Sequence, residues 1–497
     1  MSNVRVTYSG LIGFAVTLVS VVTGTIFVVI VTRRLNLEDF GLWTLIGSLV
    51  SYVTVVEPIV TYWTTRQIAR GEKVGKTALA TSGIFSIGGI IVYTILAFYV
   101  STSLDSDLGV LMIASILIPI SFMNNILNSI CAGFKPQLIS YGMVTFETSK
   151  TPLGILFVIL VPLGIIGVLI TVILANSIRM ITLFIIAREQ IVVGFKRVFI
   201  KFWLRMSWLT LYMSAHGLIY KLDVLIFSLI TKSFVGLAFW GASSSASKFV
   251  SYAGSISQGL YPKLIATGKK QYAEQSLKRS MYFAIPLVGA SIVFAKPALH
   301  MLNPLYIDGS YIVMILGLRS LVNVLTGFFF GILESYEKVD IDKKATFKMY
   351  FHSRIFKVPT LWLIMSISYV GSLSLYLILL WKPTMQESST VLIWAMILLF
   401  ITTPFMLYGM IMVKKKHNVV FPYKTISKYT GVTILSSIII VLVSENWLTY
   451  PESIWDFLPE IIPLIIFGGA IYFGITYLID DSTRKLFKSI IREIINK

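Results

Sequence analysis

Eight charged side chains lie in or near long apolar segments of the sequence, where charge is costly. They are Glu57, Glu147, Lys150, Arg179, Lys221, Asp223, Lys248 and Arg319. On membrane-insertion scales each would cost about 3 kcal/mol if it faced lipid, on the order of 24 kcal/mol together. We therefore expect these side chains to face a cavity or one another.

The interior that they form is expected to be cationic, because five of the eight are basic and three are acidic. Such an interior suits an anionic group such as a diphosphate and argues against a pump for cationic drugs. Arginine can bind two phosphate oxygens at once, whereas lysine acts as a point charge. The candidate substrate-binding residues, which include an adjacent pair near the start of the chain, are Lys248, Arg319, Lys221, Lys150, Arg179, Arg33 and Arg34.

Some of these charges could instead neutralise one another. Glu147 and Lys150 lie one helical turn apart, so a structural ion pair is as good an interpretation as a binding site. Asp223 could neutralise Lys221 from a neighbouring face. For these residues the sequence leaves both interpretations open.

The remaining interior bases differ in their surroundings. Arg179 precedes Arg188 on the same segment and could extend its side chain to the inner interface. Lys248 follows the small residues of "GASSSASKF", which leave room for a substrate, and Arg319 has no acidic residue close to it in the sequence. Lys248 and Arg319 are therefore the strongest candidates.

No catalytic motif accompanies these charges. The stretch "GEKVGKT" is one residue short of a phosphate-binding loop and follows a helical segment, and the four histidines show no metal-ligand spacing. We expect no enzyme, no cofactor and no metal. Proton or sodium exchange could be carried by Glu57, Glu147 and Asp223, although no motif supports it.

The composition is that of a polytopic membrane protein. The chain has 497 residues, of which 56% are hydrophobic and 13% charged, with a mean hydropathy of +0.83; a soluble domain has roughly 25% charged residues. Apolar runs without alternation predict an all-α bundle of about 14 transmembrane helices. The predicted spans start near Ser9, Phe40, Thr77, Leu108, Leu138, Leu163, Phe202, Val235, Met281, Tyr311, Ile355, Ser389, Tyr429 and Ile461.

The distribution of basic residues predicts the orientation. Most of the 42 Lys and Arg residues lie in the connections on the side of the amino terminus, whereas the opposite connections "STSLDSDLG" and "ENWLTYPESIWDFLPE" are acidic. Bases are retained in the cytoplasm, so both termini are expected inside a plasma membrane. The net charge of +19 is then a topology signal and a contact with phospholipids, with no nucleic acid implied. The tail "RKLFKSIIREIINK" suits an amphipathic helix on the inner leaflet.

An internal repeat predicts two lobes. "RQIARGEK" and "KLIATGKK" match without a gap at four positions, and "FGLWTLIGSLVSYV" resembles "VGLAFWGASSSASKFVSYA". A repeat of six spans gives two copies that point the same way. We expect six-helix lobes over residues 1–200 and 201–425, two additional helices over 426–480, and a cytoplasmic tail over 481–497. Prolines within spans, which permit bending, are Pro58, Pro119, Pro152, Pro286, Pro359 and Pro404.

This layout, together with the N-terminal "VTRRLNLEDFGLW", resembles the polysaccharide transporter family of the multidrug, oligosaccharidyl-lipid and polysaccharide exporter (MOP) superfamily. The resemblance implies a flippase that moves a polyprenyl-diphosphate oligosaccharide to the outer leaflet by alternating access through a cationic central cavity. Its expected partners are the anionic lipid-linked glycan, membrane phospholipids, and glycosyltransferases or a polymerase of the same pathway. The alternatives are a multidrug or lipid II exporter of the superfamily and, less favoured, a membrane glycosyltransferase or glycan ligase.

Arg33 and Arg34 are unusual because the predicted orientation places them outside. One interpretation is a helix end at the outer headgroups, with Glu38 and Asp39 balancing the charge and Trp43 at the interface. The other places at least one arginine at the outer mouth between the lobes, where it would receive the diphosphate.

Overall fold

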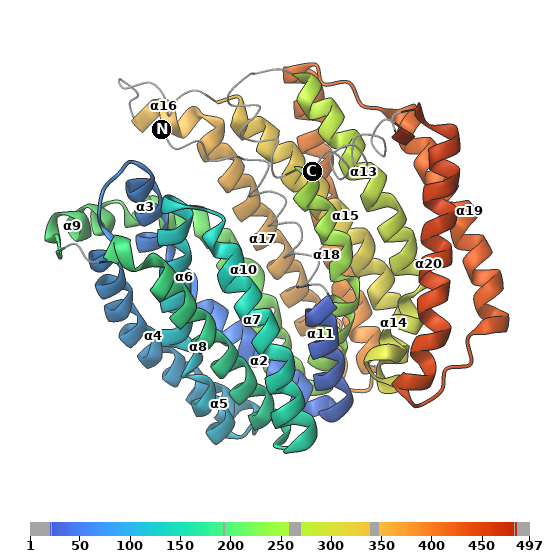
Figure 1. Cartoon of the computed structure of the whole chain (residues 1–497), viewed down its shortest axis with the longest axis horizontal. Coiled ribbons are helices and arrows are strands. Elements are labelled where there is room, and N and C mark those ends of the chain that lie inside the picture. The colour runs from blue at the N-terminus through green and yellow to red at the C-terminus, as the bar shows by residue number, and fades with distance from the viewer. Residues whose placement is uncertain are drawn as a thin grey trace. The chain divides into compact units, whose positions relative to one another are not determined.

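A computed structural model of the protein describes residues 20, 22–191, 194–257, 270–337, 347–481, 483 and 484. Within these residues the fold is all-α and contains no strand, as the sequence predicts (Figure 1). The predicted start of the first span at Ser9, most of the repeat copy "KLIATGKK" and nearly all of the amphipathic tail lie outside the described residues.

The chain forms two compact units, and the first comprises Met1–Gly241 and Trp362–Glu387. Its helical residues 22–34 are followed by α2 (Leu37–Val53), η1 (Thr54–Val56), α3 (Pro58–Ala69), α4 (Gly75–Leu104), α5 (Leu108–Ala114), α6 (Leu117–Phe134), α7 (Leu138–Gly154), η2 (Ile155–Leu160), α8 (Gly164–Ile191), α9 (Arg197–Arg205) and α10 (Ser207–Thr231). The beginning of α11 (Phe234–Ser247) and most of α17 (Arg354–Leu379) also belong to this unit.

The second unit comprises Ala242–Leu361 and Ser388–Lys497. It contains η3 (Lys248–Ser257), α13 (Lys270–Val293), α14 (Ala295–Leu302), η4 (Pro304–Gly309), α15 (Ser310–Ser335), α16 (Phe347–His352), α18 (Glu387–His417), α19 (Tyr423–Trp447) and α20 (Ile454–Ile479). The division by compactness groups α10 with the first unit, whereas the sequence assigns it to the second lobe. The lobes over 1–200 and 201–425 and their like orientation stay predictions.

Eleven of the described helical segments are long and apolar enough to cross a membrane, or twelve if α13 and α14, bent by 68°, form one span. The two other predicted spans correspond to helical residues 22–34 and to α11 with η3, both next to residues that are not described. The spans beginning near Phe40, Thr77 and Leu108 correspond to segments that begin at Leu37, Gly75 and Leu108. Hydropathy thus located the helices well.

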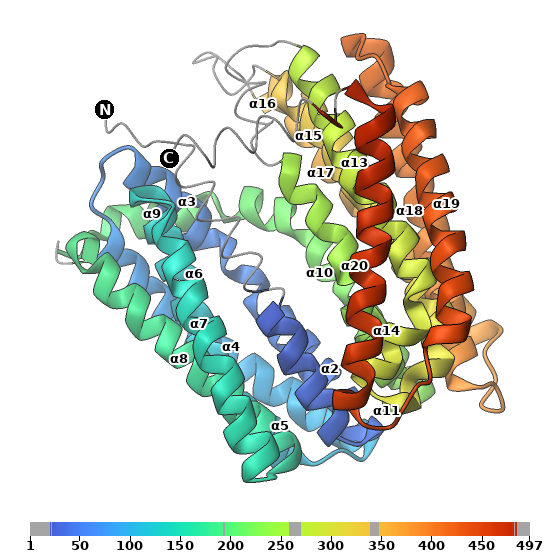
Figure 2. The ribbon, with the colours of Figure 1, turned by 45° about the vertical axis from the view of Figure 1, so that its right-hand side comes forward.

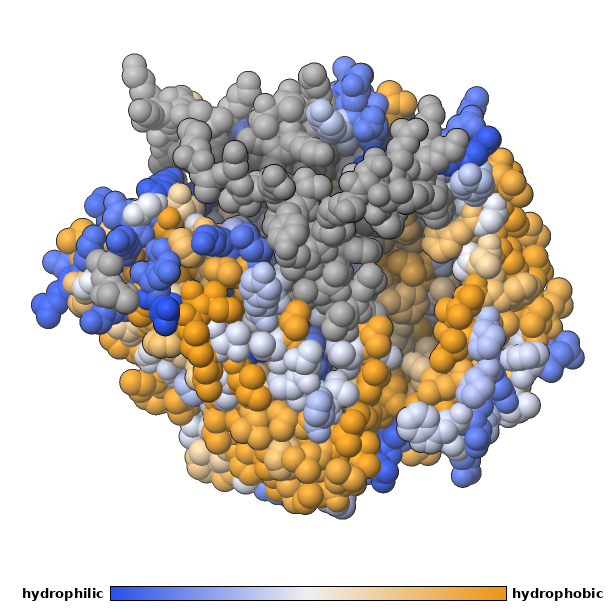
Figure 3. Space-filling model, viewed as in Figure 1, coloured by the Kyte–Doolittle hydropathy of each residue, from blue (hydrophilic) through white to orange (hydrophobic). Residues whose placement is uncertain are grey.

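Apolar side chains cover the outward faces of the helices. Along α4 the exposed residues recur at one face, with Ile84, Ile87, Ile91 and Ile95 each 59% exposed or more. The same holds for α19 and α20, where Ile438 and Ile466 are exposed, and Figure 3 shows apolar side chains over much of the visible face. Such faces are what a lipid environment stabilises.

Breaks in the helices set the positions of polar groups. A short 3₁₀ turn, η1, separates α2 from α3, and Pro58 is the first residue of α3. Proline fits at this position because the first helical N–H has no intrahelical partner. In α7, Pro152 precedes a π-helical segment, η2. The predicted bends at Pro58 and Pro152 therefore coincide with irregular helix geometry.

Within the second unit α19 packs on α13, and α20 packs on α19 and α14; Figure 2 shows α19 and α20 side by side. Tyr472 donates a hydrogen bond to the carbonyl of Tyr282, and Tyr429 donates one to Asp480 at the end of α20. Burial alone would raise the pKa of Asp480, but hydrogen bonds from Tyr429 and Thr483 and the charge of Lys278 together hold it below its ordinary value. Buried polar contacts thus attach the added helices to this unit.

Candidate functional site

A polar cavity of about 410 Å³ lies within the first unit. It is formed by α2 and η1, the start of α3, the middle of α6 and the middle of α10. Its described lining residues are Ser51, Thr54, Val55, Glu57, Pro58, Thr61, Asn125, Asn128, Ser129, Ser214, Gly217, Leu218 and Lys221. A cavity of this volume falls in the range of about 300–1,000 Å³ that is common for small-molecule sites.

Glu57 occupies the break between η1 and α3 and is 8% exposed. Asn125 of α6 donates a hydrogen bond from its Nδ2 to the Oε2 atom of Glu57. The other carboxylate oxygen, Oε1, is buried and has no hydrogen-bond partner among the residues that the structure describes. A buried acceptor left in this state is costly, and this is one reason to regard the cavity as a binding site.

Lys221 of α10 is exposed and lines the same cavity as Glu57. The cavity therefore contains one acid and one base from the predicted interior set. Its side chains are otherwise mostly neutral hydroxyls and amides. By the predicted lobe bounds, α10 belongs to the second lobe and α2, α3 and α6 to the first, so this cavity is lined by elements of both. A cationic central cavity that binds the substrate stays a prediction.

Asp223, two residues further along α10, contacts the hydroxyl group of Tyr369. It is 3% exposed and accepts a hydrogen bond of 2.6 Å at Oδ2 from the hydroxyl of Tyr369 on α17. The charge of Asp223 also acts on the Lys221 ammonium. Asp223 thus joins α10 to α17 in the first unit and lies close to Lys221, in line with the predicted neutralisation.

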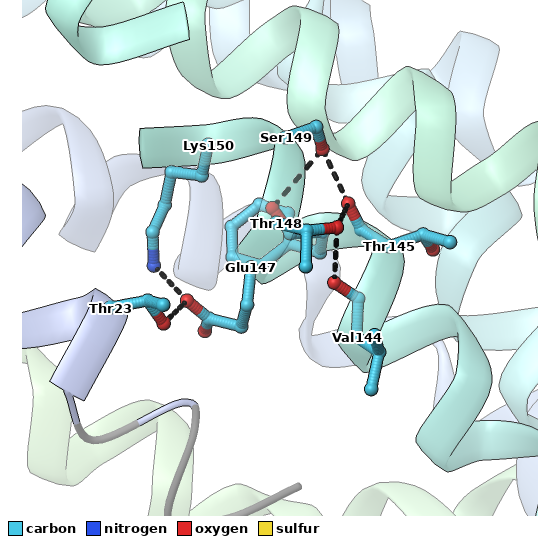
Figure 4. Close-up of polar contacts among 8 residues, drawn as sticks. Thr23, Val144, Thr145, Glu147, Thr148, Ser149 and Lys150 are labelled. Carbon is cyan, nitrogen blue, oxygen red and sulfur yellow. Dashed lines mark hydrogen bonds and ion pairs between the residues drawn. The ribbon is translucent and has the colours of Figure 1, made fainter. Parts of the chain in front are cut away.

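A second buried cluster lies at the middle of α7 (Figure 4). Oε2 of Glu147 accepts hydrogen bonds of 2.7 Å from both the Lys150 ammonium and the Thr23 hydroxyl. The ion pair between Glu147 and Lys150, one of the two interpretations that the sequence leaves open, is present, and the two residues are 6% and 7% exposed. The Lys150 ammonium also lies 4.8 Å from the ring centre of Phe146. The hydrogen bond from Thr23 to Glu147 joins helical residues 22–34 to α7.

Arg179 of α8 adds a third charge to this region, because the Glu147 carboxylate interacts with it electrostatically. Its Nε atom is buried and has no hydrogen-bond partner within the described residues. The cluster around Glu147 therefore carries two bases for one acid. Substrate binding by Arg179 and Lys150 stays a prediction.

In the second unit, Lys248 and Arg319 lie on neighbouring elements. Lys248 begins η3 and is exposed, and Arg319 in the middle of α15 is half-buried. η3 packs against α15. The two strongest sequence candidates therefore belong to adjoining helical segments of one unit, and their role as phosphate ligands stays a prediction.

Arg33 and Arg34 end the helical residues 22–34, where basic side chains complement the helix dipole. Arg34 is exposed and Arg33 is half-buried. The next helix starts directly afterwards, because the Asn36 side chain caps α2 by accepting a 2.7 Å hydrogen bond from the backbone N–H of Asp39. The structure thus shows a helix boundary here, which both interpretations of the pair require.

Sequence reasoning missed the amides of α6. Asn125 and Asn128 line the cavity, and the Oδ1 atom of Asn128 is buried without a hydrogen-bond partner in the described part of the chain. The signal was present in "SFMNNILNSI", where two amides recur at a spacing of three within an apolar span. Polar groups at that spacing share one face of a helix.

No protein-family model and no curated protein matches the sequence. Solved structures are similar to the chain, and two of them are described here. The lipid II flippase MurJ in an inward closed conformation aligns with a TM-score of 0.62 and 14% identity, covering 98% of this chain and 100% of that one. An inward-facing multidrug resistance MATE family transporter of the MOP superfamily aligns with a TM-score of 0.60 and 11% identity, covering 80% of this chain and 95% of that one. The chain thus shares the fold of transporters of the MOP superfamily.

Proposed function

We propose that the protein is a flippase that moves a polyprenyl-diphosphate-linked oligosaccharide from the cytoplasmic to the outer leaflet of the plasma membrane. The observation that carries the proposal is the set of cationic side chains within apolar helices of this fold. Lys150, Arg179, Lys221, Lys248 and Arg319 all lie in described helices. Interior cations suit a diphosphate, which must otherwise cross the hydrocarbon without water.

The extent of the structural likeness favours a lipid-linked cargo over a drug. The similarity to the lipid II flippase covers 98% of the chain, so it includes α19 and α20, whereas the similarity to the multidrug transporter covers 80%. A multidrug or lipid II exporter is the second candidate. Glu57 supports the drug exporter, because a buried carboxylate in a cavity can bind an organic cation.

Alternating access would move the two lobes about the bound headgroup. The membrane potential assists this direction, since an anion moving to a positive outside gains about 2.3 kcal/mol per charge per 100 mV. Exchange of protons or sodium through Glu57, Glu147 or Asp223 is a second energy source that the sequence suggests.

The test is a translocation assay with the purified full-length protein in vesicles. We expect the lipid-linked oligosaccharide loaded on one leaflet to reach the other with its glycan unchanged. A new glycosidic bond would instead identify a glycosyltransferase or ligase. Transport of cationic dyes without any movement of the glycan lipid would identify a drug exporter, and either result would overturn the proposal.

A further inference from the structure

The hydroxyl groups of the cavity around Glu57 have already used their protons. Each donates to a backbone carbonyl three or four residues earlier on its own helix. The pairs are Ser51 with Gly47, Thr54 with Ser51, Thr61 with Glu57, Ser129 with Asn125, and Ser214 with Thr210, at 2.8–3.2 Å. A hydroxyl has one proton and two lone pairs. These five side chains can therefore only accept hydrogen bonds from a molecule in the cavity.

Two further residues that line the cavity, Glu57 and Asn128, carry acceptor oxygens without a partner in the described part of the chain. Oε1 of Glu57 and Oδ1 of Asn128 are both buried, and neither has a hydrogen-bond partner among the described residues. They come from different elements, the η1–α3 break and α6. Buried acceptors are normally paired, so the occupant of this cavity is expected to bring several donors.

A polyol and a cation are the two kinds of ligand that satisfy many acceptors. A cation would meet one acid, Glu57, and one base, Lys221, in the same lining, so attraction and repulsion offset each other. A sugar depends on neither charge, because its hydroxyls can donate to the acceptors of the lining and its oxygens can accept from Lys221. The cavity of about 410 Å³ has room for a short glycan segment.

We propose that this cavity binds sugar residues of the cargo and selects the glycan by hydrogen bonding, while the cationic side chains elsewhere bind the diphosphate. The inference deepens the proposed function and rests on it. Glu57 then binds sugar hydroxyls, and its ability to accept hydrogen bonds matters more for this binding than its negative charge. Asn128 is the clearest reporter, because replacing it by leucine removes its acceptor at nearly constant size.

The experiment measures binding of two lipids to the full-length protein in nanodiscs. One lipid is the polyprenyl-diphosphate oligosaccharide extracted from cells that make the protein, and the other is the sugar-free polyprenyl diphosphate. We expect Asn128→Leu to reduce the preference for the glycan-bearing lipid about tenfold, the effect of one lost hydrogen bond of about 1.4 kcal/mol. Binding of the sugar-free lipid should not change. Because the readout is a ratio from one preparation, the folded fraction cancels.

Asn124→Leu is the matched control, since Asn124 is the same residue type on α6 but does not line the cavity and bonds to the carbonyl of Asn176. Glu57→Gln keeps an acceptor and should lower the preference less than Glu57→Leu. An unchanged preference in Asn128→Leu would overturn the sugar-binding inference and leave the proposed function standing. The inference would also fall if sodium or a dye cation stabilised the wild type and no longer stabilised Glu57→Gln. If the wild type bound neither polyprenyl lipid better than phosphatidylglycerol, the proposed function would fail and the inference with it.

Discussion

At the residue scale, the interior charges differ in burial and in pairing. Lys150 is held by Glu147 and the ring of Phe146, so removing it would leave a buried acid. Lys248, by contrast, is exposed on η3. A side chain that is accessible within an apolar segment is better placed to meet a substrate than one that is fully paired.

The first prediction concerns Lys248 and Arg319. We expect Lys248→Ala and Arg319→Ala each to slow translocation of the glycan lipid about 10- to 100-fold, because each loses a charge-assisted contact of about 1.5–3 kcal/mol with the diphosphate. Expression and membrane insertion should be unaffected. Translocation rates in vesicles, normalised to folded protein, check this. Lys415→Ala, at an exposed position near the end of α18, is the control and should be silent; normal transport by both interior variants would rule out the cationic mechanism.

The second prediction separates the two interpretations of Arg33 and Arg34. A phosphate-binding arginine grips two oxygens and should lose most activity even as Arg33→Lys, whereas an interfacial helix end should tolerate lysine and lose yield as glutamine. The half-buried Arg33 is expected to show the stronger effect. The assay compares Lys and Gln at each position in vesicle translocation. Parental rates in all four variants would show that neither arginine handles substrate.

At the element scale, the close approach of two helices explains the glycine of the "DFGLW" stretch, which hydropathy does not explain. In "DFGLW" the glycine is Gly41, and a β-carbon there would lie 1.9 Å from the carbonyl oxygen of Phe234 at the start of α11. Only glycine permits this backbone contact. The Phe-Gly of the family-like stretch is therefore a packing requirement between α2 and α11, and the arginines before it need a separate explanation.

The third prediction follows from this contact. Gly41→Ala should destabilise the protein by about 1–3 kcal/mol through overpacking. Gly47→Ala is the matched control on the same helix, because a β-carbon there has nothing within 4 Å. Alanine should stabilise that helical position by up to about 1 kcal/mol. Thermal unfolding followed by fluorescence-detected chromatography measures both, and equal stability of the two variants would contradict the packing argument.

At the scale of the whole molecule, the sequence predicted the helices but only part of the site. Hydropathy placed spans such as α4 because every lipid-facing side chain contributes to the signal. The Glu147–Lys150 pair was predictable because it is local to one helical turn. The cavity at Glu57 was not predictable, because it depends on how the break between η1 and α3 packs against α6 and α10. In the sequence its serines and threonines look like ordinary polar residues of a membrane span. Contacts between distant segments are set by packing, which composition does not encode.

The orientation in the membrane is the last prediction, and it rests on charge alone. Bases near membrane spans are retained in the cytoplasm, and the connection after α3 contains the exposed Lys73, whereas the turn after α4 contains the exposed Asp105. Single cysteines are placed at these two positions and at Ser453 and Lys415, all exposed, in a Cys131→Ala background. Cys131 is fully buried, so its replacement by a similarly small residue should be tolerated.

In intact cells an impermeant thiol reagent should label the cysteines at Asp105 and Ser453 and spare those at Lys73 and Lys415. Permeabilised cells control for accessibility and should label all four. The reverse pattern would place the termini outside, and Arg33 and Arg34 would then lie at the cytoplasmic face, where their charge would need no special role.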